Sequence, residues 1–216
     1  MPETLNRPGN DRTIRDTLFG DQPLEQWAGA ESEDLPWNLF KDAKRCVDKG
    51  KNNQAIEMLK KITTLPGLES RHYLQAYFFL NELGSFPEAD IELFAVVVEV
   101  AMDEGLDLLA IYADHSARYY HASGAGVIWD VPDITIGSKI DHILSLGNGI
   151  IEQIGPWKAE RPAAPVNGRA RLNLLTSKGL HFGEADQNVL FQDPLSSKIM
   201  YAMLDMMETL VNKAKK

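Results

Sequence analysis

The segment from Ile91 to Asp130 alternates apolar runs with turn sequences at short spacing. The runs are "LFAVVVEVA", "LDLLAIYA", "ARYYH" and "VIWD", and the sequences "MDEG", "ADHS" and "ASGAG" separate them. β-Branched and aromatic residues favour strands, whereas Asp, Ser and Gly favour tight turns because they bond the local backbone or adopt positive φ. Strands joined so closely pair with their neighbours. The segment therefore predicts a four-stranded antiparallel meander, with a helix over 87–93 as an alternative for its start.

The residues after the meander predict two helices around a second hairpin. Apolar residues at helical spacing predict a helix over 138–154, in which Ser138 and Asp141 have the spacing of a capping box. The runs "RLNLLT" and "LHFG" flank the turn "SKG" and predict the hairpin, which follows a surface linker. Asp193 is suited to the N-cap of a terminal helix that extends to the last lysines.

The residues between Pro36 and Leu83 predict three helices, each ended by a glycine or a Pro-Gly sequence. In the first two of these helices, the large residues, a small residue and the residue that ends the second helix stand near the positions where a known helical motif has residues of those kinds. They are Trp37, Phe40, Ala55 and Pro66. On these residues, the segment 36–85 resembles a tetratricopeptide helical hairpin, without a second copy. Such hairpins are stable in stacks of about three or more. The resemblance therefore implies a unit that packs against the rest of the chain, with protein binding as its associated property.

The order of elements predicts an α+β fold: helices, then a meander, a helix, a hairpin and a helix. We expect an antiparallel sheet with helices packed on one face. In element order, this part is similar to the profilin-like and roadblock-like sandwiches, which implies an architecture and no activity. We divide the chain into an acidic, partly irregular N-terminal arm over 1–36, a helical region over 37–85 and an α+β domain over 86–216.

The N-terminal arm combines acids and prolines with the large apolar residues Leu18, Phe19 and Trp27. A disordered tail rarely contains such side chains, so we expect part of the arm to dock on the body. We also expect the body to fold without about the first 25 residues, because termini of this composition tolerate truncation. Five core residues are predicted from the helix faces: Trp37, Leu59, Ile143, Ile151 and Leu210.

The acidic composition restricts the classes of partner. The 216 residues include 31 acidic and 22 basic side chains, which gives a formal net charge of −9. A field of that sign repels phosphate backbones, so we expect neither nucleic acid nor an anionic membrane as a partner. No run reaches the roughly 18 apolar residues of a membrane span, and the first residues lack the apolar core of a signal peptide. A single cysteine, Cys46, fits a reducing compartment, so a cytoplasmic location is expected.

Three histidines and two carboxylates are the candidate catalytic residues: His115, His121 and His181, with Asp114 and Glu184. Asp114, His115 and Ser116 are adjacent, and adjacent side chains point apart, so they cannot form a Ser-His-Asp triad among themselves. The histidines would bind zinc, copper or nickel if the two hairpins were neighbours, but their spacing matches no ligand signature. We expect turn residues and exposed strand histidines here, with neither metal nor other cofactor.

Other motifs have structural interpretations. The "GAG" at 124–126 lacks the third glycine and the following helix of a dinucleotide-binding loop, and Gly147 and Gly149 suit a helix lying close to a sheet or a kink. Methionines on the last helix are expected in the core, and Cys46 as a buried structural thiol. A basic face on the first two predicted helices indicates a solvated surface, with an acidic peptide as the alternative partner; it contains Lys41, Lys44, Arg45, Lys49, Lys51, Lys60 and Lys61.

Two hypotheses of function follow. The first is a non-catalytic interaction or adaptor protein of the cytoplasm, with a protein as partner. The second is an enzyme of unknown reaction that uses the histidines and carboxylates of the segments 112–121 and 180–184. A deep pocket that gathers those side chains would favour the enzyme, and an uncovered apolar groove would favour the interaction protein.

Overall fold

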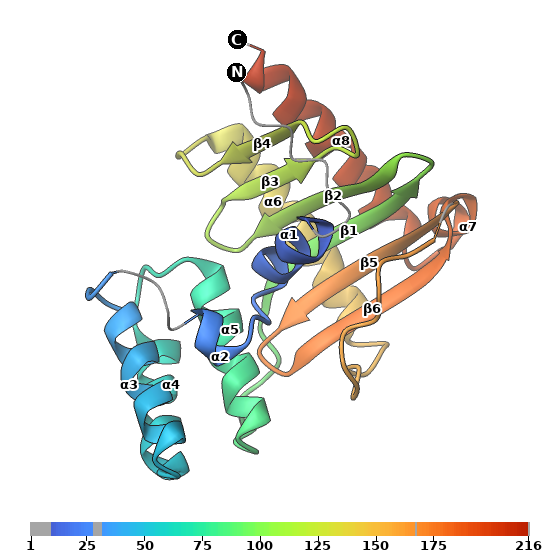
Figure 1. The fold of residues 1–216 in the computed structure, drawn as a ribbon. Helices are drawn as coiled ribbons and strands as arrows, with labels where there is room; N and C mark the ends of the chain where they lie inside the picture. Colours follow the sequence, from blue (N-terminus) through green and yellow to red (C-terminus); the bar gives the residue numbers. More distant parts are fainter. Residues whose placement is uncertain (1–9, 28–31, 167, 216) are drawn as a thin grey trace.

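A computed structural model describes residues 10–27, 32–166 and 168–215 of the protein. Within these ranges, six strands form an antiparallel sheet in the order β4-β3-β2-β1-β5-β6 (Figure 1). The strands are β1 (Leu93–Met102), β2 (Gly105–Tyr112), β3 (Ala117–Tyr120), β4 (Gly126–Trp129), β5 (Arg169–Thr176) and β6 (Gly179–Asp186). The helices are α1 (Asn10–Phe19), α2 (Leu24–Trp27), α3 (Trp37–Asp48), α4 (Asn52–Thr64), α5 (Ser70–Glu82), α6 (Ile134–Ile151), α7 (Gln187–Gln192) and α8 (Ser197–Ala214). The α+β fold class is thus confirmed.

The meander and the second hairpin form where the sequence predicts them. In the turn between β2 and β3, the backbone N–H of His115 donates to the carbonyl of Tyr112 at 3.0 Å. Between β3 and β4, the N–H of His121 donates to the carbonyl of Ala125 at 2.8 Å. Residues 87–92 are not helical and β1 begins at Leu93, so the alternative helix over 87–93 is wrong.

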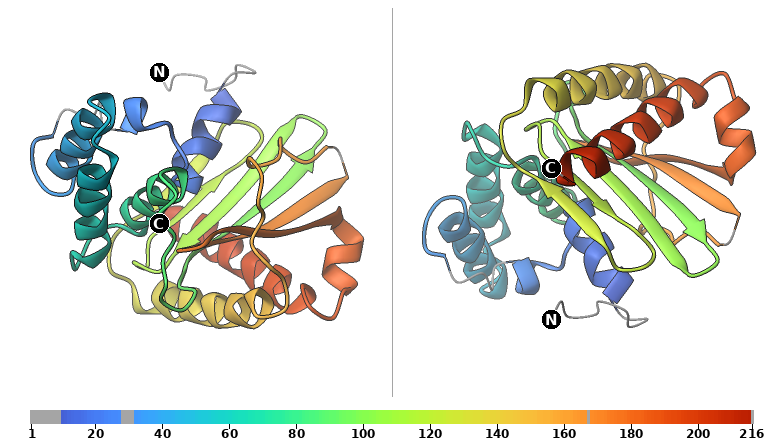
Figure 2. Two further views of the ribbon diagram at one scale, coloured as in Figure 1. Left: turned by 90° about the horizontal axis from the view of Figure 1, so that it is seen from below. Right: turned by 90° about the horizontal axis from the view of Figure 1, so that it is seen from above.

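Helices lie on both faces of the sheet, whereas the sequence predicts helices on one face. Helices α6 and α8 lie side by side on one face, and α1 and α5 contact the other (Figure 2). Along β1, Val96 and Val98 pack in the core under α6 and α8, while Ala95 and Val97 pack with residues of α1 and α5. This alternation follows from the two-residue period of a strand.

Helix α6 begins four residues earlier than predicted, at Ile134. Its N-cap is Asp133, whose carboxylate accepts from the backbone N–H groups of Thr135 and Ile136 at 2.9 and 3.1 Å, so the capping box of Ser138 and Asp141 is wrong. A Cβ on Gly147 would lie 2.7 Å from Cδ2 of Leu93, which confirms the close approach of the helix to the sheet. A Cβ on Gly149 would meet nothing within 4 Å, so only Gly147 has this role.

The end of the chain forms two helices where one was predicted. The short helix α7 follows β6 directly, and α8 begins after a turn over residues 193–196. The carboxylate of Asp193 accepts from the backbone N–H groups of Leu195 and Ser196 at 2.9 and 3.0 Å. Asp193 therefore organises the turn before α8, whereas the N-cap is Ser196, so the predicted N-cap is wrong. On α8, Met200, Met203 and Met206 are buried, as expected for core residues.

The N-terminal arm contributes regular, buried structure where it is described; residues 1–9 and 28–31 of the arm lie outside the described residues. Leu18, Phe19 and Trp27 are buried, which confirms that the arm docks. Arg15 of α1 is also buried and forms an ion pair with the fully buried Glu99 of β1. Removing α1 would leave Glu99 without this partner, so the structure argues against truncating about the first 25 residues without loss.

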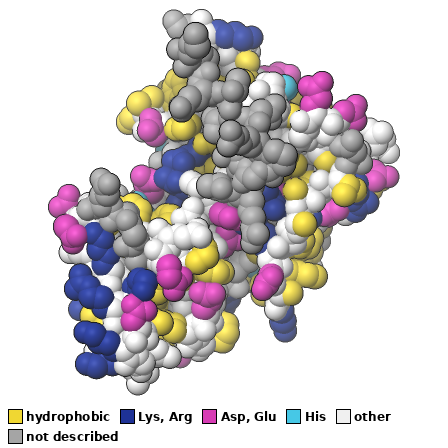
Figure 3. All heavy atoms as spheres, in the orientation of Figure 1, with side chains coloured by type: hydrophobic (Ala, Val, Ile, Leu, Met, Phe, Trp, Pro, Cys, Tyr) yellow, Lys and Arg dark blue, Asp and Glu magenta, His cyan; other side chains and the backbone are white. Residues whose placement is uncertain are grey.

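Helices α3, α4 and α5 share a separate apolar core built on Phe40, Leu59 and Phe79. Lysines and arginines gather on the surface of α3 and α4 (Figure 3). Part of that basic face is neutralised locally, since Lys44 pairs with Asp48 and Arg45 with Asp42. The tetratricopeptide-like character of the segment 36–85 stays a prediction.

The core predictions are mostly confirmed. Leu59, Ile143, Ile151 and Leu210 are buried, whereas Trp37 is only partly buried at the edge of the α3–α5 core. Cys46 is likewise half-buried, with its Sγ 3.9 Å from Oε1 of Gln54, so the expected buried thiol is wrong. None of the helices in the described part of the chain has the length and apolar character to cross a membrane.

Candidate functional site

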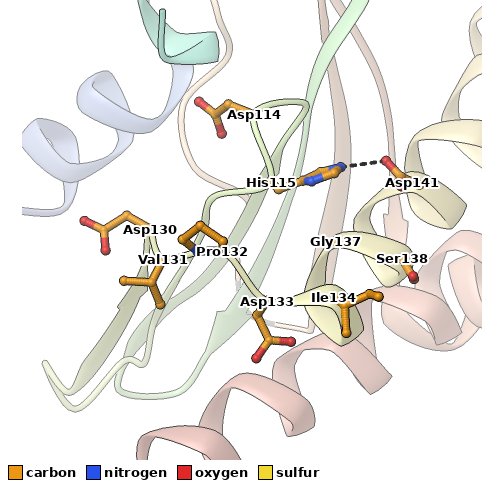
Figure 4. Close-up of a pocket in the computed structure, with 10 residues that line it drawn as sticks. All are labelled: Asp114, His115, Asp130, Val131, Pro132, Asp133, Ile134, Gly137, Ser138 and Asp141. Carbon is orange, nitrogen blue, oxygen red and sulfur yellow. Dashed lines mark hydrogen bonds and ion pairs between the residues drawn. The ribbon is translucent and has the colours of Figure 1, made fainter. Parts of the chain in front are cut away.

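A hollow of about 400 Å³ opens at the start of helix α6 (Figure 4). We call it the α6 hollow. The turn between β2 and β3, the segment that follows β4 and the first turns of α6 form its walls. Its lining residues are Asp114, His115, Asp130, Val131, Pro132, Asp133, Ile134, Gly137, Ser138 and Asp141.

His115 closes the hollow on the side of the sheet. Its φ of 64° is the left-handed conformation that the β2–β3 turn requires at this position. The ring reaches α6, where Nε2 lies 2.8 Å from Oδ1 of Asp141 (Figure 4). A Cβ on Gly137 would lie 3.1 Å from Nδ1 of His115, so the absence of a side chain there lets the ring lie against the helix. The hydrogen bond to Asp141 thereby links the turn to the first turns of α6.

Asp114, beside His115, links the same turn to helix α5. Its Oδ2 accepts from the backbone N–H of Ser70 at 2.6 Å, and its own N–H donates to Oγ of Ser70 at 3.0 Å. Its Oδ1 accepts from both the backbone N–H and the hydroxyl of Ser116, at 2.9 and 2.6 Å. Since Ser70 is the first residue of α5, Asp114 satisfies a free N–H at the start of that helix.

Asp133 and Asp130 are two further carboxylates of the hollow with different surroundings. Besides capping α6, Asp133 accepts at Oδ2 from Nζ of Lys213 at 2.5 Å. The hydrogen bond from Lys213, together with the bonds from the helix N–H groups, lowers the pKa of Asp133. No hydrogen bond or ion pair joins the exposed Asp130 carboxylate to any other residue that the structure describes. Asp130 is therefore available to a ligand, whereas Asp133 already serves the fold.

Exposed apolar side chains lie among these carboxylates. Ile134 is 88% exposed and Val131 is 54% exposed, and Pro132 between them is exposed as well. The sequence explains the position: "DVPD" follows β4, and its last Asp caps α6, which places Ile134 at the first, outward position of the helix. The hollow is thus lined by both exposed apolar side chains and aspartate carboxylates.

The predicted site residues do not converge. Of the five candidates, the structure brings only Asp114 and His115 together at the hollow. His121 lies in the β3–β4 turn, with Nδ1 2.8 Å from Oγ of Ser123. His181 is fully buried on β6, which is four strand positions from β3 in the sheet, or about 19 Å at the usual spacing of strands. His115, His121 and His181 therefore occupy separate places, and the expectation of an exposed strand histidine is wrong for the buried His181.

Glu184 lies on the opposite face of β6 from His181, and its carboxylate is bonded to two arginines. Its Oε1 accepts from Nε of Arg169 at 2.7 Å, and its Oε2 accepts from Nε of Arg171 at 2.9 Å. These arginines lower the pKa of Glu184, against the opposing effect of burial, which is the largest single cause. Through Arg171, Glu184 belongs to the same charge network as the buried Glu99.

The geometry limits the chemistry that the hollow supports. Ser138 lines the hollow, but no hydrogen bond joins its hydroxyl to His115, and the hydroxyl of Ser116 donates to Asp114 instead. Among residues 10–27, 32–166 and 168–215, no three His, Cys, Asp or Glu side chains are grouped so that they would hold a metal ion. What the hollow presents to a ligand is negative charge beside apolar surface.

Sequence reasoning identified the turn residues of the hollow and missed those after β4. Asp130 ends the predicted strand run "VIWD", and Asp133 and Ile134 fall between that run and the helix predicted from Ser138. The usable signal was Asp133 ahead of "ITIG", an N-cap residue before a helical run. The β-branched residues Ile134 and Thr135 obscured it, since they have low helix propensity.

Comparison of the chain with protein-family models, with curated proteins and with solved structures finds no match.

Proposed function

We propose that this protein is a non-catalytic interaction or adaptor protein that binds a partner protein at the α6 hollow. One observation carries the proposal: Ile134, 88% exposed, stands with the half-exposed Val131 on the rim of the hollow. Apolar side chains gathered at a concave surface mark interaction sites, whereas single exposed ones are ordinary. Burying such a side chain under a partner contributes about 1.5–3 kcal/mol.

The bonding of Asp114 and His115 supports this proposal. Both side chains connect the β2–β3 turn to helices, Asp114 to α5 and His115 to α6. The hollow is therefore held in shape by residues on three elements that are distant in sequence, as a preformed binding surface requires. A cytoplasmic location is part of the proposal, and the single cysteine supports it.

An enzyme is the second candidate, favoured by one specific observation. The 2.8 Å contact between His115 and Asp141 is the arrangement of a base oriented by a carboxylate. Turnover of generic ester, phosphate or peptide substrates by the wild type, lost in His115→Ala, would favour the enzyme over the interaction protein.

Site-specific photo-crosslinking tests the interaction. A benzophenone side chain replaces Ile134 in the full chain, and the same side chain at Val189 is the control, because Val189 is 53% exposed on the separate helix α7. We expect a discrete protein adduct from position 134 that is absent from position 189. The adduct partner, identified by mass spectrometry and purified, should bind the wild type and bind Ile134→Ser more weakly. Equal adducts from both positions, or unchanged binding of Ile134→Ser, would contradict the proposal.

A further inference from the structure

We propose that the occupant of the α6 hollow is a cationic segment of the partner protein, with Lys or Arg side chains against the carboxylates and an adjacent aliphatic side chain on Val131 and Ile134. The inference rests on the proposed function and specifies the chemistry of its partner.

Charge complementarity is the first argument. Four aspartates line the hollow, namely Asp114, Asp130, Asp133 and Asp141, and the lysine that contacts them is Lys213, on Asp133. Asp130 has no hydrogen bond or ion pair to a described residue, and Asp141 shares one carboxylate oxygen with His115. A concave surface of one sign concentrates ligands of the opposite sign and speeds their association. A Lys or Arg side chain would supply to Asp130 the partner that no described residue provides.

The apolar rim is the second argument, and it distinguishes a peptide from a small cation. Val131 and Ile134 lie on the same rim as Asp130. A metal ion would leave both apolar side chains in water, and the unbranched methylene linkers of a polyamine would cover them less than a branched aliphatic side chain, whereas a peptide brings a charged and an aliphatic side chain together. Nucleic acid is disfavoured, because the carboxylates repel its phosphates.

The size of the hollow is the third argument. Its volume of about 400 Å³ lies at the lower end of the range of ligand pockets. Such a space accommodates a few side chains of a short segment, rather than a folded domain. The partner therefore enters with a short segment, for which alternation of basic and aliphatic residues fits the arrangement of Asp130, Val131 and Ile134.

Fluorescence anisotropy with synthetic peptides tests the proposal on the full chain. The probe is a labelled twelve-residue peptide of alternating Arg and Leu; one comparison peptide has Glu in place of Arg, another has Ser in place of Leu, and spermine is the small cation. We expect the Arg-Leu peptide to bind at least about tenfold more tightly than either comparison peptide. We also expect its affinity to fall with salt, since the contact is partly ionic.

Four variants locate the binding. Ile134→Ser should weaken the Arg-Leu peptide about tenfold and Asp130→Asn about threefold, whereas Glu57→Gln on α4 and Val189→Ser on α7 should change its affinity less than about twofold. All four positions are exposed, so thermal melts should confirm that each variant remains folded.

Several results would overturn the inference: no preference for the Arg-Leu peptide over the Glu-Leu peptide, equal displacement by spermine at matched charge, or insensitivity to Ile134→Ser and Asp130→Asn. A discrete adduct at position 134 with no such peptide preference would retain the proposed function and reject the cationic segment. Failure of the crosslinking experiment would reject the proposed function itself.

Discussion

Nε of Arg15 lies 2.5 Å from Oε1 of Glu99, although 84 residues separate the two in the sequence. Both side chains are buried, Glu99 completely, and Nη1 of Arg171 lies 3.3 Å from the other carboxylate oxygen of Glu99. The pair joins helix α1 to the central strands of the sheet. It makes the described part of the N-terminal arm a component of the fold rather than an appendage.

Glu99→Gln should destabilise the protein strongly, by about 3–5 kcal/mol, because two buried arginines would lose the charge that they share. Equilibrium unfolding in urea measures the loss. Asp48→Asn is the matched control: it removes the exposed pair of Asp48 with Lys44 and should leave the midpoint unchanged. A loss below about 1 kcal/mol in Glu99→Gln would show that water or rearrangement compensates the arginines.

Gly147 and Gly149 of α6 should respond in opposite directions to replacement by Ala. Ala at 149 meets nothing within 4 Å and should stabilise the helix, by up to about 1 kcal/mol. Ala at 147 would approach the buried side chains of Leu93 and Leu174 at 2.7 and 3.2 Å, and overpacking typically costs about 1–3 kcal/mol. Equal gains for both variants in thermal unfolding would mean that α6 lies farther from the sheet.

His181 should make the protein less stable in mild acid. Burial lowers the pKa of His181 below its ordinary value of 6.5, because the charged ring is disfavoured in the folded state. The unfolded chain then binds the proton more tightly, so the stability from His181 is complete above pH 6.5 and decreases as the pH falls from there towards the folded pKa.

The comparison for this prediction is His181→Leu, which should lose less stability than the wild type between pH 7.5 and pH 5. His142→Gln, at an exposed position of α6, is the control and should follow the wild type. His72 has a pKa lowered by burial in the same direction and contributes to the same acid loss in all three proteins. Parallel curves for His181→Leu and the wild type would exclude His181 as a cause.

Asp133 should act on α6 mainly as a hydrogen-bond acceptor. Asp133→Asn keeps an oxygen for the N–H groups of Thr135 and Ile136, whereas Asp133→Ala removes it. We therefore expect the thermal midpoint to fall clearly in Asp133→Ala and much less in Asp133→Asn. Equal falls would instead assign the stabilisation to the ion pair with Lys213. The hydrogen bond from Lys213 is the largest cause of the lowered pKa of Asp133, so only the part of the stabilisation that depends on the charge should be lost as the pH falls below about 4.

The features that sequence predicted are local. The strands of the meander follow from β-branched runs between turn residues, and the "ADHS" turn follows from Asp and Ser that bond their own backbone. Helix faces follow from the spacing of Leu59, Ile143 and Leu210. Each of these inferences needs only a window of a few residues.

The features that sequence did not predict depend on contacts across the chain. Nothing in the sequence indicates that Arg15 and Glu99 form an ion pair, since either residue alone is typical of a solvated surface. The reach of His115 to Asp141 depends on the position of α6 against the β2–β3 turn. The start of α6 was missed for a local reason, because Ile134 and Thr135 favour strands more than helices. The contact of His115 with Asp141 and the start of α6 both form part of the α6 hollow, so sequence did not predict the hollow.

Chemical-shift mapping of the amides of the ¹⁵N-labelled full chain, titrated with the Arg-Leu peptide, tests most directly whether the α6 hollow is a docking surface for a cationic segment. We predict saturable shifts at His115, Val131, Ile134 and Gly137, which all line the hollow, and none on the basic helices α3 and α4. Shifts that concentrate elsewhere on the protein, or that do not saturate at any position, would contradict the account.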